Sequence, residues 1–347
     1  MKNIIATWMY SSPEGENIFH AQVGPHSAKQ KTRNLYWRCV FLLFESSSRH
    51  NPNAEHILLL NKKPPAQIDG IDTARLMEQY RIQAVPFPTI TKSPKDYYKA
   101  WNSQFILLDA IDYLKGHAAA DDRVFILDSD IIFNRPISDE LIARLDSHKA
   151  LLYSLHLGDW SENGLNSKEL LEISQEIYSG FPEEEFVYSG GEIICCLGSE
   201  LRPIAELARR SYALCLERHQ QGLKKFNEEA HLLSSVYHMR GYRPYTANPY
   251  FRRLWTDRSI YSNLEGDEDQ LIFWHLPAEK KYGFRKVFRS YRLRSGSYQL
   301  TKTDFIHAYR IEETLASKVF RLLMQYVLRP VRTWSASCHK RLSALAR

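Results

Sequence analysis

Short apolar runs typical of buried β-strands alternate with longer helical patterns through the first two thirds of the sequence. This alternation predicts βαβ units around a mostly parallel sheet, and so an α/β fold. We expect strands at residues 4–10, 56–60, 83–87, 123–127, 150–156, 185–197 and 270–275. We expect helices around residues 35–43 and at 72–80, 94–116, 199–221 and 228–239, with Ser93 and Gly116 bounding the one at 94–116.

The charge distribution divides the chain near residue 285. The 347 residues carry a net charge of +6. Residues 280–347 contain 16 Lys and Arg but three acidic residues, a net charge of +13, which leaves −7 on the rest of the chain. We therefore predict one large domain over residues 1–285 and a basic, partly amphipathic extension over residues 286–347.

Three features of the sequence indicate a cytoplasmic protein. The cysteines are odd in number and have no CxxC spacing, which favours reduced thiols; they are Cys39, Cys195, Cys196, Cys215 and Cys338. The first ten residues have no cleavage pattern behind them and fit a first strand better than a signal peptide. No apolar stretch approaches the ~18 residues that a membrane-spanning helix requires.

Two carboxylates, Asp128 and Asp130, directly follow the predicted strand at residues 123–127. Ligands of an open parallel sheet bind beyond the carboxyl ends of its strands. The alternating spacing points both carboxylates toward one side, where a shared cation relieves their repulsion. Mg²⁺ commonly binds through one or two carboxylates together with substrate phosphates. This position therefore suits a metal-bound nucleotide diphosphate.

The same spacing recurs at Asp267 and Asp269, in a different context. These residues follow Gly266 in a polar stretch with no apolar strand before it, so we interpret them as a solvated loop. For Asp128 and Asp130 the structural alternative is a turn or a helix cap after a strand. The preceding apolar strand favours the ligand role.

The segment 124–133, with Asp128 and Asp130 at its centre, resembles the DxD segment of GT-A glycosyltransferases, notably family eight and its bacterial relatives that build surface polysaccharides. The segment 272–275 is similar to the late strand of that family, which ends in a metal-binding His, here His275. A Lys follows six residues later in the family, and Lys281 has that spacing. The resemblance implies a GT-A fold, a Rossmann-like and mostly parallel central sheet flanked by helices, with a helical basic C-terminal extension.

The resemblance also implies which residues form the site. Mn²⁺ or Mg²⁺ would be held by Asp128, Asp130 and His275. The nucleotide sugar would be bound by Asp128, Ser129, Gln104, Gly190, Gly191 and Lys281. Among these, Gln104 stands on the predicted donor-side helix where the family commonly has a basic residue, and Gly190 and Gly191 resemble a strand start that lets the backbone approach the donor sugar.

Glu192 and Glu229 are the predicted catalytic residues. Sugar-hydroxyl recognition and deprotonation of an acceptor both use a carboxylate, and Glu229 stands where relatives carry an acidic or amide pair near the reacting carbon. The structural alternative for each is a helix cap or a surface salt bridge, because acidic residues are favoured in the first turn of a helix.

The resemblance implies transfer of a sugar from a nucleotide-diphosphate sugar, with UDP-sugar as the family's commonest donor, to a glycan or lipid-linked acceptor in cell-surface polysaccharide synthesis. One alternative is a metal-dependent nucleotidyltransferase, but residues 11–15 match its Gly-rich phosphate loop poorly. The other is a non-catalytic GT-A-like scaffold that binds membrane or nucleic acid through its basic tail. The enzyme interpretation predicts no nucleic-acid partner.

Apolar and basic residues alternate through segment 318–332 of the extension. Such a segment could lie at a membrane interface against anionic lipid, which would make the protein peripheral on the inner face of the membrane. A packed helix with a solvated basic face is an equal alternative.

Overall fold

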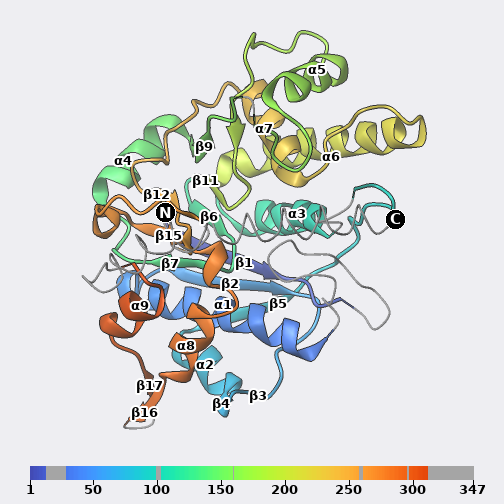
Figure 1. The fold of residues 1–347 in the computed structure, drawn as a ribbon. Helices are drawn as coiled ribbons and strands as arrows, with labels where there is room; N and C mark the ends of the chain where they lie inside the picture. The colour runs from blue at the N-terminus through green and yellow to red at the C-terminus, as the bar shows by residue number, and fades with distance from the viewer. Residues whose placement is uncertain (13–28, 99–102, 159, 258–260, 295–296, 312–347) are drawn as a thin grey trace, which may run out of the picture.

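The structure, a computed structural model, describes residues 1–12, 29–98, 103–158, 160–257, 261–294 and 297–311 (Figure 1). Within these residues a mixed six-stranded sheet lies between helices on its two faces, which confirms the predicted α/β class. Segment 318–332, predicted either to meet a membrane or to pack as a helix, lies outside the described residues.

The central sheet has the strand order β5-β2-β1-β6-β11-β8. Its first four strands are parallel, and β11 is antiparallel to both of its neighbours. The strands are β5 (Ile82–Pro86), β2 (Glu55–Leu60), β1 (Asn3–Met9), β6 (Arg123–Leu127), β11 (Ile193–Leu197) and β8 (Ala150–Leu151). The chain order reverses direction between β1 and β6, and the carboxyl ends of strands at such a switch point bound a ligand crevice.

Alternate residues of the strands face opposite helical layers. In β2, Ile57 and Leu59 share a core cluster with residues of α3 (Leu107–His117) and α6 (Gly198–Gln220). Leu58 and Leu60 pack instead with α1 (Gln30–His50). Because both faces of the sheet are covered, β2 and β6 are continuous apolar runs rather than alternating ones.

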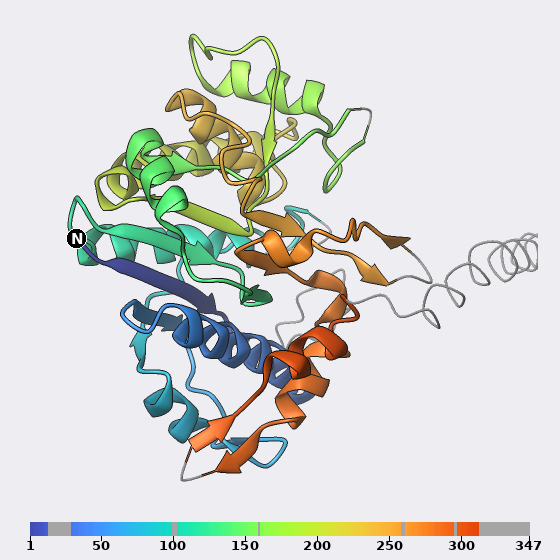
Figure 2. The ribbon, with the colours of Figure 1, turned by 90° about the vertical axis from the view of Figure 1, so that its left-hand side faces the viewer.

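The middle of α1 is buried on all sides, since residues 39–44 are inaccessible to solvent. A helix that is apolar all round requires cover on the side away from the sheet. The cover comes from α8 (Gly283–Arg289) and α9 (Lys302–Ala308), whose Phe284, Phe288 and Phe305 lie in one core cluster with Phe41 (Figure 2, orange and red against blue). The domain boundary predicted near residue 285 therefore falls inside α8.

The helix predicted at residues 94–116 is wrong at both ends. A 3₁₀ turn, η1 (Gln104–Ile106), precedes α3, and Gly116 lies inside α3 rather than after it. Residues 94–98, which the structure also describes, are not helical. The buried carboxylate of Asp109 in α3 accepts hydrogen bonds from the backbone N–H groups of Ile90 and Thr91 at 2.8 and 2.9 Å and from the Thr91 hydroxyl at 2.5 Å.

Two predicted strands are each divided. The strand predicted at 150–156 becomes β8 and β9 (Ser154–Leu155), and the one at 185–197 becomes β10 (Tyr188–Ser189) and β11. β9 and β10 pair with each other in a separate two-stranded sheet. The chain leaves regular strand geometry at residues 190–192, and Glu192 then lies beside the carboxyl end of β6, where its carbonyl accepts from the N–H of Asp128.

A second sheet, with order β12-β15-β7, joins distant parts of the chain beside the carboxyl end of β6. Its strands are β7 (Ile131–Phe133), β12 (Phe251–Arg253) and β15 (Phe273–His275). β15 pairs antiparallel with β7 and parallel with β12. This sheet carries the late part of the chain to the residues that follow β6.

The remaining elements complete the fold. The helices are α2 (Thr73–Gln79), α4 (Asp139–His148), α5 (Ser167–Ile177) and α7 (Glu229–Met239), and the short turns are η2 (Glu268–Gln270) and η3 (Pro277–Glu279). The small hairpins pair β3 (Gln67–Ile68) with β4 (Ile71–Asp72), β13 (Thr256–Asp257) with β14 (Tyr261–Ser262), and β16 (Arg292–Arg294) with β17 (Ser297–Gln299). Among the described residues, no helix is both long and apolar enough to cross a membrane.

Candidate metal centre and adjoining cleft

A tight turn after β6 presents Asp128 and Asp130 at the edge of the sheet. The backbone N–H of Asp128 donates to the carbonyl of Glu192 at 2.8 Å, and the N–H of Ile131 donates back to the carbonyl of Asp128 at 3.2 Å. β7 begins immediately afterwards. The turn is thus fixed on one side by the strand break at Glu192 and on the other by the second sheet.

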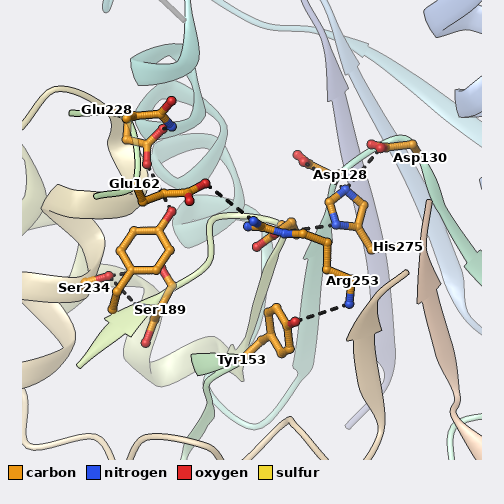
Figure 3. Close-up of polar contacts among 12 residues, drawn as sticks. Asp128, Asp130, Tyr153, Glu162, Ser189, Glu228, Ser234, Arg253 and His275 are labelled. Atoms are coloured by element: carbon orange, nitrogen blue, oxygen red, sulfur yellow. Dashed lines mark hydrogen bonds and ion pairs between the residues drawn. The ribbon is translucent and has the colours of Figure 1, made fainter. Parts of the chain in front are cut away.

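His275 joins this turn through strand pairing. Its residue lies opposite Ile131 in the β15–β7 register, and the next N–H, of Leu276, donates to the carbonyl of Asp130 at 3.0 Å. Its Nε2 lies 3.1 Å from Oδ2 of Asp130 and 3.9 Å from Oδ2 of Asp128 (Figure 3). The structure therefore brings the three predicted metal ligands together.

The three side chains offer the oxygen and nitrogen atoms that metal sites use, and several of these atoms lack a well-aligned hydrogen bond within the described part of the chain. Their ligand atoms all lie within 4.8 Å of one another. Oδ2 of Asp130 and both ring nitrogens of His275 are buried without a well-aligned hydrogen bond to any described residue, although buried polar atoms normally have partners. Two carboxylates and an imidazole could hold a divalent cation, with open positions for oxygen atoms of a ligand.

A lysine completes the cluster, and it is Lys280 rather than the predicted Lys281. Nζ of Lys280 lies 3.0 Å from Oδ2 of Asp130, and its side chain is buried. Lys281 is exposed and lines neither cavity described below. The turn η3 lies between His275 and these lysines, and its winding directs the fifth residue after the His inward and the sixth outward.

The pKa values of the side chains in the cluster are strongly shifted. Burial opposes ionisation of Asp130, but Lys280 and His275 outweigh it and hold the pKa of that carboxyl below its usual range. Burial also lowers the pKa of His275, yet Asp130 and Glu192 raise it to about 9. Burial and the charge of Asp130 raise the pKa of Asp128 to about 7. Without a cation, His275 is therefore protonated at neutral pH, and a metal ion would replace that proton.

Glu192 lies behind His275 and is held by Arg253. The guanidinium of Arg253 forms an ion pair with Glu192 Oε1, and Nδ1 of His275 lies 3.5 Å from the same oxygen. Although burial opposes it, Arg253 keeps Glu192 ionised and lowers its pKa to about 2. A carboxylate behind a ligating His fixes the orientation of the ring. This placement suits a positioning role better than the predicted catalytic role, because so acidic a group is a poor base.

The predicted glycines make room for carboxyl groups. A Cβ atom at Gly190 would lie 1.9 Å from Oε2 of Glu192, and one at Gly191 would lie 3.0 Å from Oε1 of Glu229. Neither position has room for a larger side chain unless these carboxyl groups move. The glycines therefore allow Glu192 and Glu229 to approach the backbone at the strand break.

Glu229, at the start of α7, lines a cleft beside the metal cluster. The cleft is lined by Gln104, Asp128, Glu162, Asn163, Tyr188, Gly191, Glu192, Glu228, Glu229, Ala230, Arg253, Trp255, His275, Pro277 and Lys280. Burial and the neighbouring carboxyl of Glu228 raise the pKa of Glu229 well above its usual range. Burial also raises the pKa of Glu228 to about 7, against hydrogen bonds from Tyr188 and Asn163. Glu228 is thus poised to exchange a proton near neutral pH, and the surroundings of Glu229 disfavour its charged form.

A second cavity lies at the switch point between β1 and β6. It is lined by Thr7, Trp8, Met9, Tyr10, Arg33, Tyr36, Ser103, Gln104, Asp128, Ser129, Asp130 and Lys280. The predicted residues Gln104 and Ser129 lie here, beside the metal cluster. Asp128 and Lys280 line both cavities, so the cluster separates two adjoining compartments.

The two acidic residues of the second DxD-like motif lie elsewhere. Asp267 is half exposed and forms an ion pair with Arg252 at 2.7 Å, and Asp269 belongs to η2. Neither residue lines a cavity of the metal cluster. Their surface position agrees with the interpretation as a solvated segment.

Several residues of the site belong to no sequence motif and were not predicted. Arg253 ends a three-residue strand that was not predicted, and Tyr36 and Arg33 come from α1. Glu162 precedes α5 in an irregular segment. Arg253 could have been predicted only from the strand pairing of the second sheet, which joins segments that are far apart in the sequence.

No model of a known protein family matches this sequence, and no curated protein is significantly similar to it.

Proposed function

We propose that this protein is a divalent-metal-dependent glycosyltransferase of the GT-A kind, which transfers a sugar from a nucleotide-diphosphate sugar to a glycan or lipid-linked acceptor. The observation that carries the proposal is the convergence of Asp128, Asp130 and His275 at the switch point of the sheet. Each of the two cavities beside them can hold one part of a donor.

The cavity at the end of β1 suits the nucleotide. It offers the aromatic side chains of Trp8, Tyr10 and Tyr36, the amide of Gln104 and the guanidinium of Arg33. Aromatic surface with a few convergent polar groups is typical of sites for planar ligands. A uridine diphosphate donor is the first candidate, because it is the commonest in the family that the sequence resembles.

The metal cluster suits the diphosphate. Mn²⁺ or Mg²⁺ held there would act as a Lewis acid on the leaving phosphate. Lys280 lies at the same place and would add positive charge to the leaving group, the role that the sequence assigned to Lys281. Asp128 lines both cavities and can also accept from a ribose hydroxyl.

The cleft lined by Glu229 suits the transferred sugar and the acceptor. Its carboxyl and amide groups can bind hydroxyls, and Glu229, whose pKa burial and Glu228 raise, is the candidate for proton transfer with the acceptor. Glu192 would orient His275 and Arg253 rather than take part in proton transfer. Arg253 spans the distance between the metal cluster and Glu162 (Figure 3).

A lipid-linked acceptor would be met at a membrane surface. α8 turns Arg285, Lys286 and Arg289 toward solvent, and Tyr282 just before it is 71% exposed. Basic side chains beside an aromatic ring suit anionic headgroups. We propose peripheral binding through this face and the basic extension, on the inner side of the membrane. Co-sedimentation with anionic but not neutral vesicles at low salt tests this part separately.

Release of nucleoside diphosphate from a panel of nucleotide sugars, with Mn²⁺ and with chelator, tests the enzyme. We expect metal-dependent release that is lost in Asp130→Asn. Asp267→Asn is the matched control, since it changes the same residue type in the same spacing at the surface. Activity that survives Asp130→Asn would contradict the proposal, and pyrophosphate exchange with a nucleoside triphosphate and a sugar phosphate would identify a nucleotidyltransferase instead.

A further inference from the structure

The cleft beside the metal cluster contains more carboxyl groups than its cations can neutralise. Four glutamates line it, Glu162, Glu192, Glu228 and Glu229. The described residues that line it with positive charge are Arg253, His275 and Lys280. His275 and Lys280 contact Asp130 at 3.1 and 3.0 Å, so they already serve the metal cluster. His275 also approaches Glu192 at 3.5 Å, which leaves Arg253 as the lining cation that does not contact Asp130.

Arg253 is committed to two of these glutamates. It forms an ion pair with Glu192, and its Nη1 lies 3.5 Å from Oε1 of Glu162. Glu228 has neutral partners, since it accepts a hydrogen bond from the Tyr188 hydroxyl at 3.0 Å and another from the Asn163 amide. Glu229, the fourth glutamate, has neither kind of side-chain partner among the described residues, and its own backbone N–H is the donor beside its carboxyl.

None of these contacts involves the carboxyl group of Glu229. Its residue is 8% exposed, and its Oε2 is buried with no hydrogen-bond partner among the described residues. The missing side chain of Gly191 leaves this carboxyl accessible from the cleft, because a Cβ there would lie 3.0 Å from Oε1. A buried carboxylate oxygen without a donor is unfavourable, so a donor from a ligand is expected at Oε2.

The chemistry of the cleft favours a cationic donor over a neutral one. A hydroxyl group would satisfy Oε2 of Glu229 but would bring no positive charge to Glu228 and Glu229. An ammonium group would do both, and it would favour the ionised form of Glu229. Trp255 also lines the cleft, and carboxylates combined with an aromatic ring are typical of amine recognition.

We propose that this cleft binds a sugar that carries a protonated amino group, with Glu229 as the carboxylate that accepts from the ammonium. The inference rests on the proposed function only in identifying the ligand as a sugar. The amino sugar is either the one being transferred or the acceptor, and both have the same recognition chemistry.

Binding of free glucosamine and free glucose to the metal-free protein tests the proposal. We expect ligand-observed NMR titrations at neutral pH to give a dissociation constant about tenfold lower for glucosamine than for glucose, since a charge-assisted hydrogen bond exceeds a neutral one by this order. Glu229→Gln should bring the two constants to within about twofold, because it keeps the shape and removes the charge. Glu206→Gln, on the exposed face of α6, should keep the preference.

Equal affinity of the wild-type protein for the two sugars would overturn the proposal without use of any variant. A preference for glucosamine that survives Glu229→Gln would also overturn it. Glu229→Gln should fold, since it removes a buried charge, and a thermal melt checks this. Repeating the titration with nucleotide-linked glucosamine and glucose in the presence of Mn²⁺ shows whether the amino sugar is the donor or the acceptor. Tighter binding of nucleotide-linked glucosamine than of nucleotide-linked glucose assigns the amine to the donor. A preference for glucosamine that is seen only with the free sugars assigns it to the acceptor. Since the first titration uses neither metal nor transfer, the proposed function and this inference can fail independently.

Discussion

Nε2 of His275 lies 3.1 Å from Oδ2 of Asp130 because β15 pairs with β7 in the register that sets His275 opposite Ile131. The metal cluster therefore depends on one strand pairing between segments that are far apart in the sequence. A cation bound there would link the two sheets. Metal binding should for this reason also stabilise the fold.

Mn²⁺ should raise the melting temperature of the wild-type protein. At a free concentration of one hundred times the dissociation constant, binding to the folded state alone adds about 2.7 kcal/mol to the free energy of unfolding. Asp130→Asn should remove this shift, while Asp267→Asn should keep it. Differential scanning fluorimetry with and without chelator makes the comparison. An equal shift in wild type and Asp130→Asn would place the metal elsewhere.

Lys280→Ala should impair transfer without weakening metal binding. The ammonium lies 3.0 Å from Oδ2 of Asp130, where it competes with a metal ion, so its removal should leave Mn²⁺ affinity equal or higher. Its loss from the leaving diphosphate should lower kcat/KM by about 10²–10³-fold. Lys281→Ala, one residue further in the exposed position, should change kcat/KM by less than about twofold.

Equal losses in the two lysine variants would contradict this assignment. So would a fall of Mn²⁺ affinity in Lys280→Ala that accounts for the whole loss of activity, because Lys280 would then support the metal site rather than the leaving group. Isothermal titration with Mn²⁺ separates the two effects.

Gly190→Ala should destabilise the site, whereas Gly116→Ala should not. A Cβ at Gly190 would collide with the carboxylate of Glu192, which is buried and held by Arg253. The displacement should cost about 1–3 kcal/mol in the free energy of unfolding. At Gly116 no atom lies within 4 Å of the new Cβ, and the residue is inside α3. Alanine there should stabilise the protein by about 0.5–1 kcal/mol. Urea unfolding of both variants measures the difference, and equal effects would show that Glu192 moves freely.

The sequence predicted the parts of the site that depend on local pattern. An apolar strand followed at once by Asp128 and Asp130 is visible without a structure, and so is a short apolar run that ends in His275. Arg253 was not predictable, because it belongs to a three-residue strand that exists only through pairing with β15. The choice between Lys280 and Lys281 depends on the winding of η3, which residue spacing does not reveal.

Arg310→Ala should destabilise the protein through Glu279. The carboxylate of Glu279 is fully buried and accepts hydrogen bonds from Nε and Nη2 of Arg310 at 2.9 and 2.7 Å. Because Glu279 precedes Lys280, this contact also ties the end of α9 to the metal cluster. Loss of the guanidinium should lower the free energy of unfolding by about 1–3 kcal/mol.

The double variant Arg310→Ala with Glu279→Gln should recover part of that stability, since it removes the buried charge that the single variant leaves unpaired. Arg285→Ala, on the exposed face of α8, is the control and should change stability by less than about 0.5 kcal/mol. No recovery in the double variant, measured by chemical denaturation, would show that Arg310 acts through other contacts.

Stability should fall on acidification as His231 takes up a proton only in the unfolded chain. Burial lowers the pKa of this ring from 6.5 to about 4 in the folded protein. Its Nδ1 accepts from the N–H of Asn227 at 3.3 Å, and its Nε2 lies 3.1 Å from the carbonyl of Glu162. The neutral ring fits these partners, and a second proton on Nδ1 would displace the first of them.

The pKa of His231 is lower in the folded than in the unfolded chain, so the stabilisation is complete above about pH 6.5 and is lost as the pH falls toward 4. The shift corresponds to about 3 kcal/mol. His231→Gln, which cannot titrate, should therefore show a smaller loss of unfolding free energy between pH 7 and pH 4 than the wild type. Identical slopes for the two proteins would mean that the ring is already protonated in the fold.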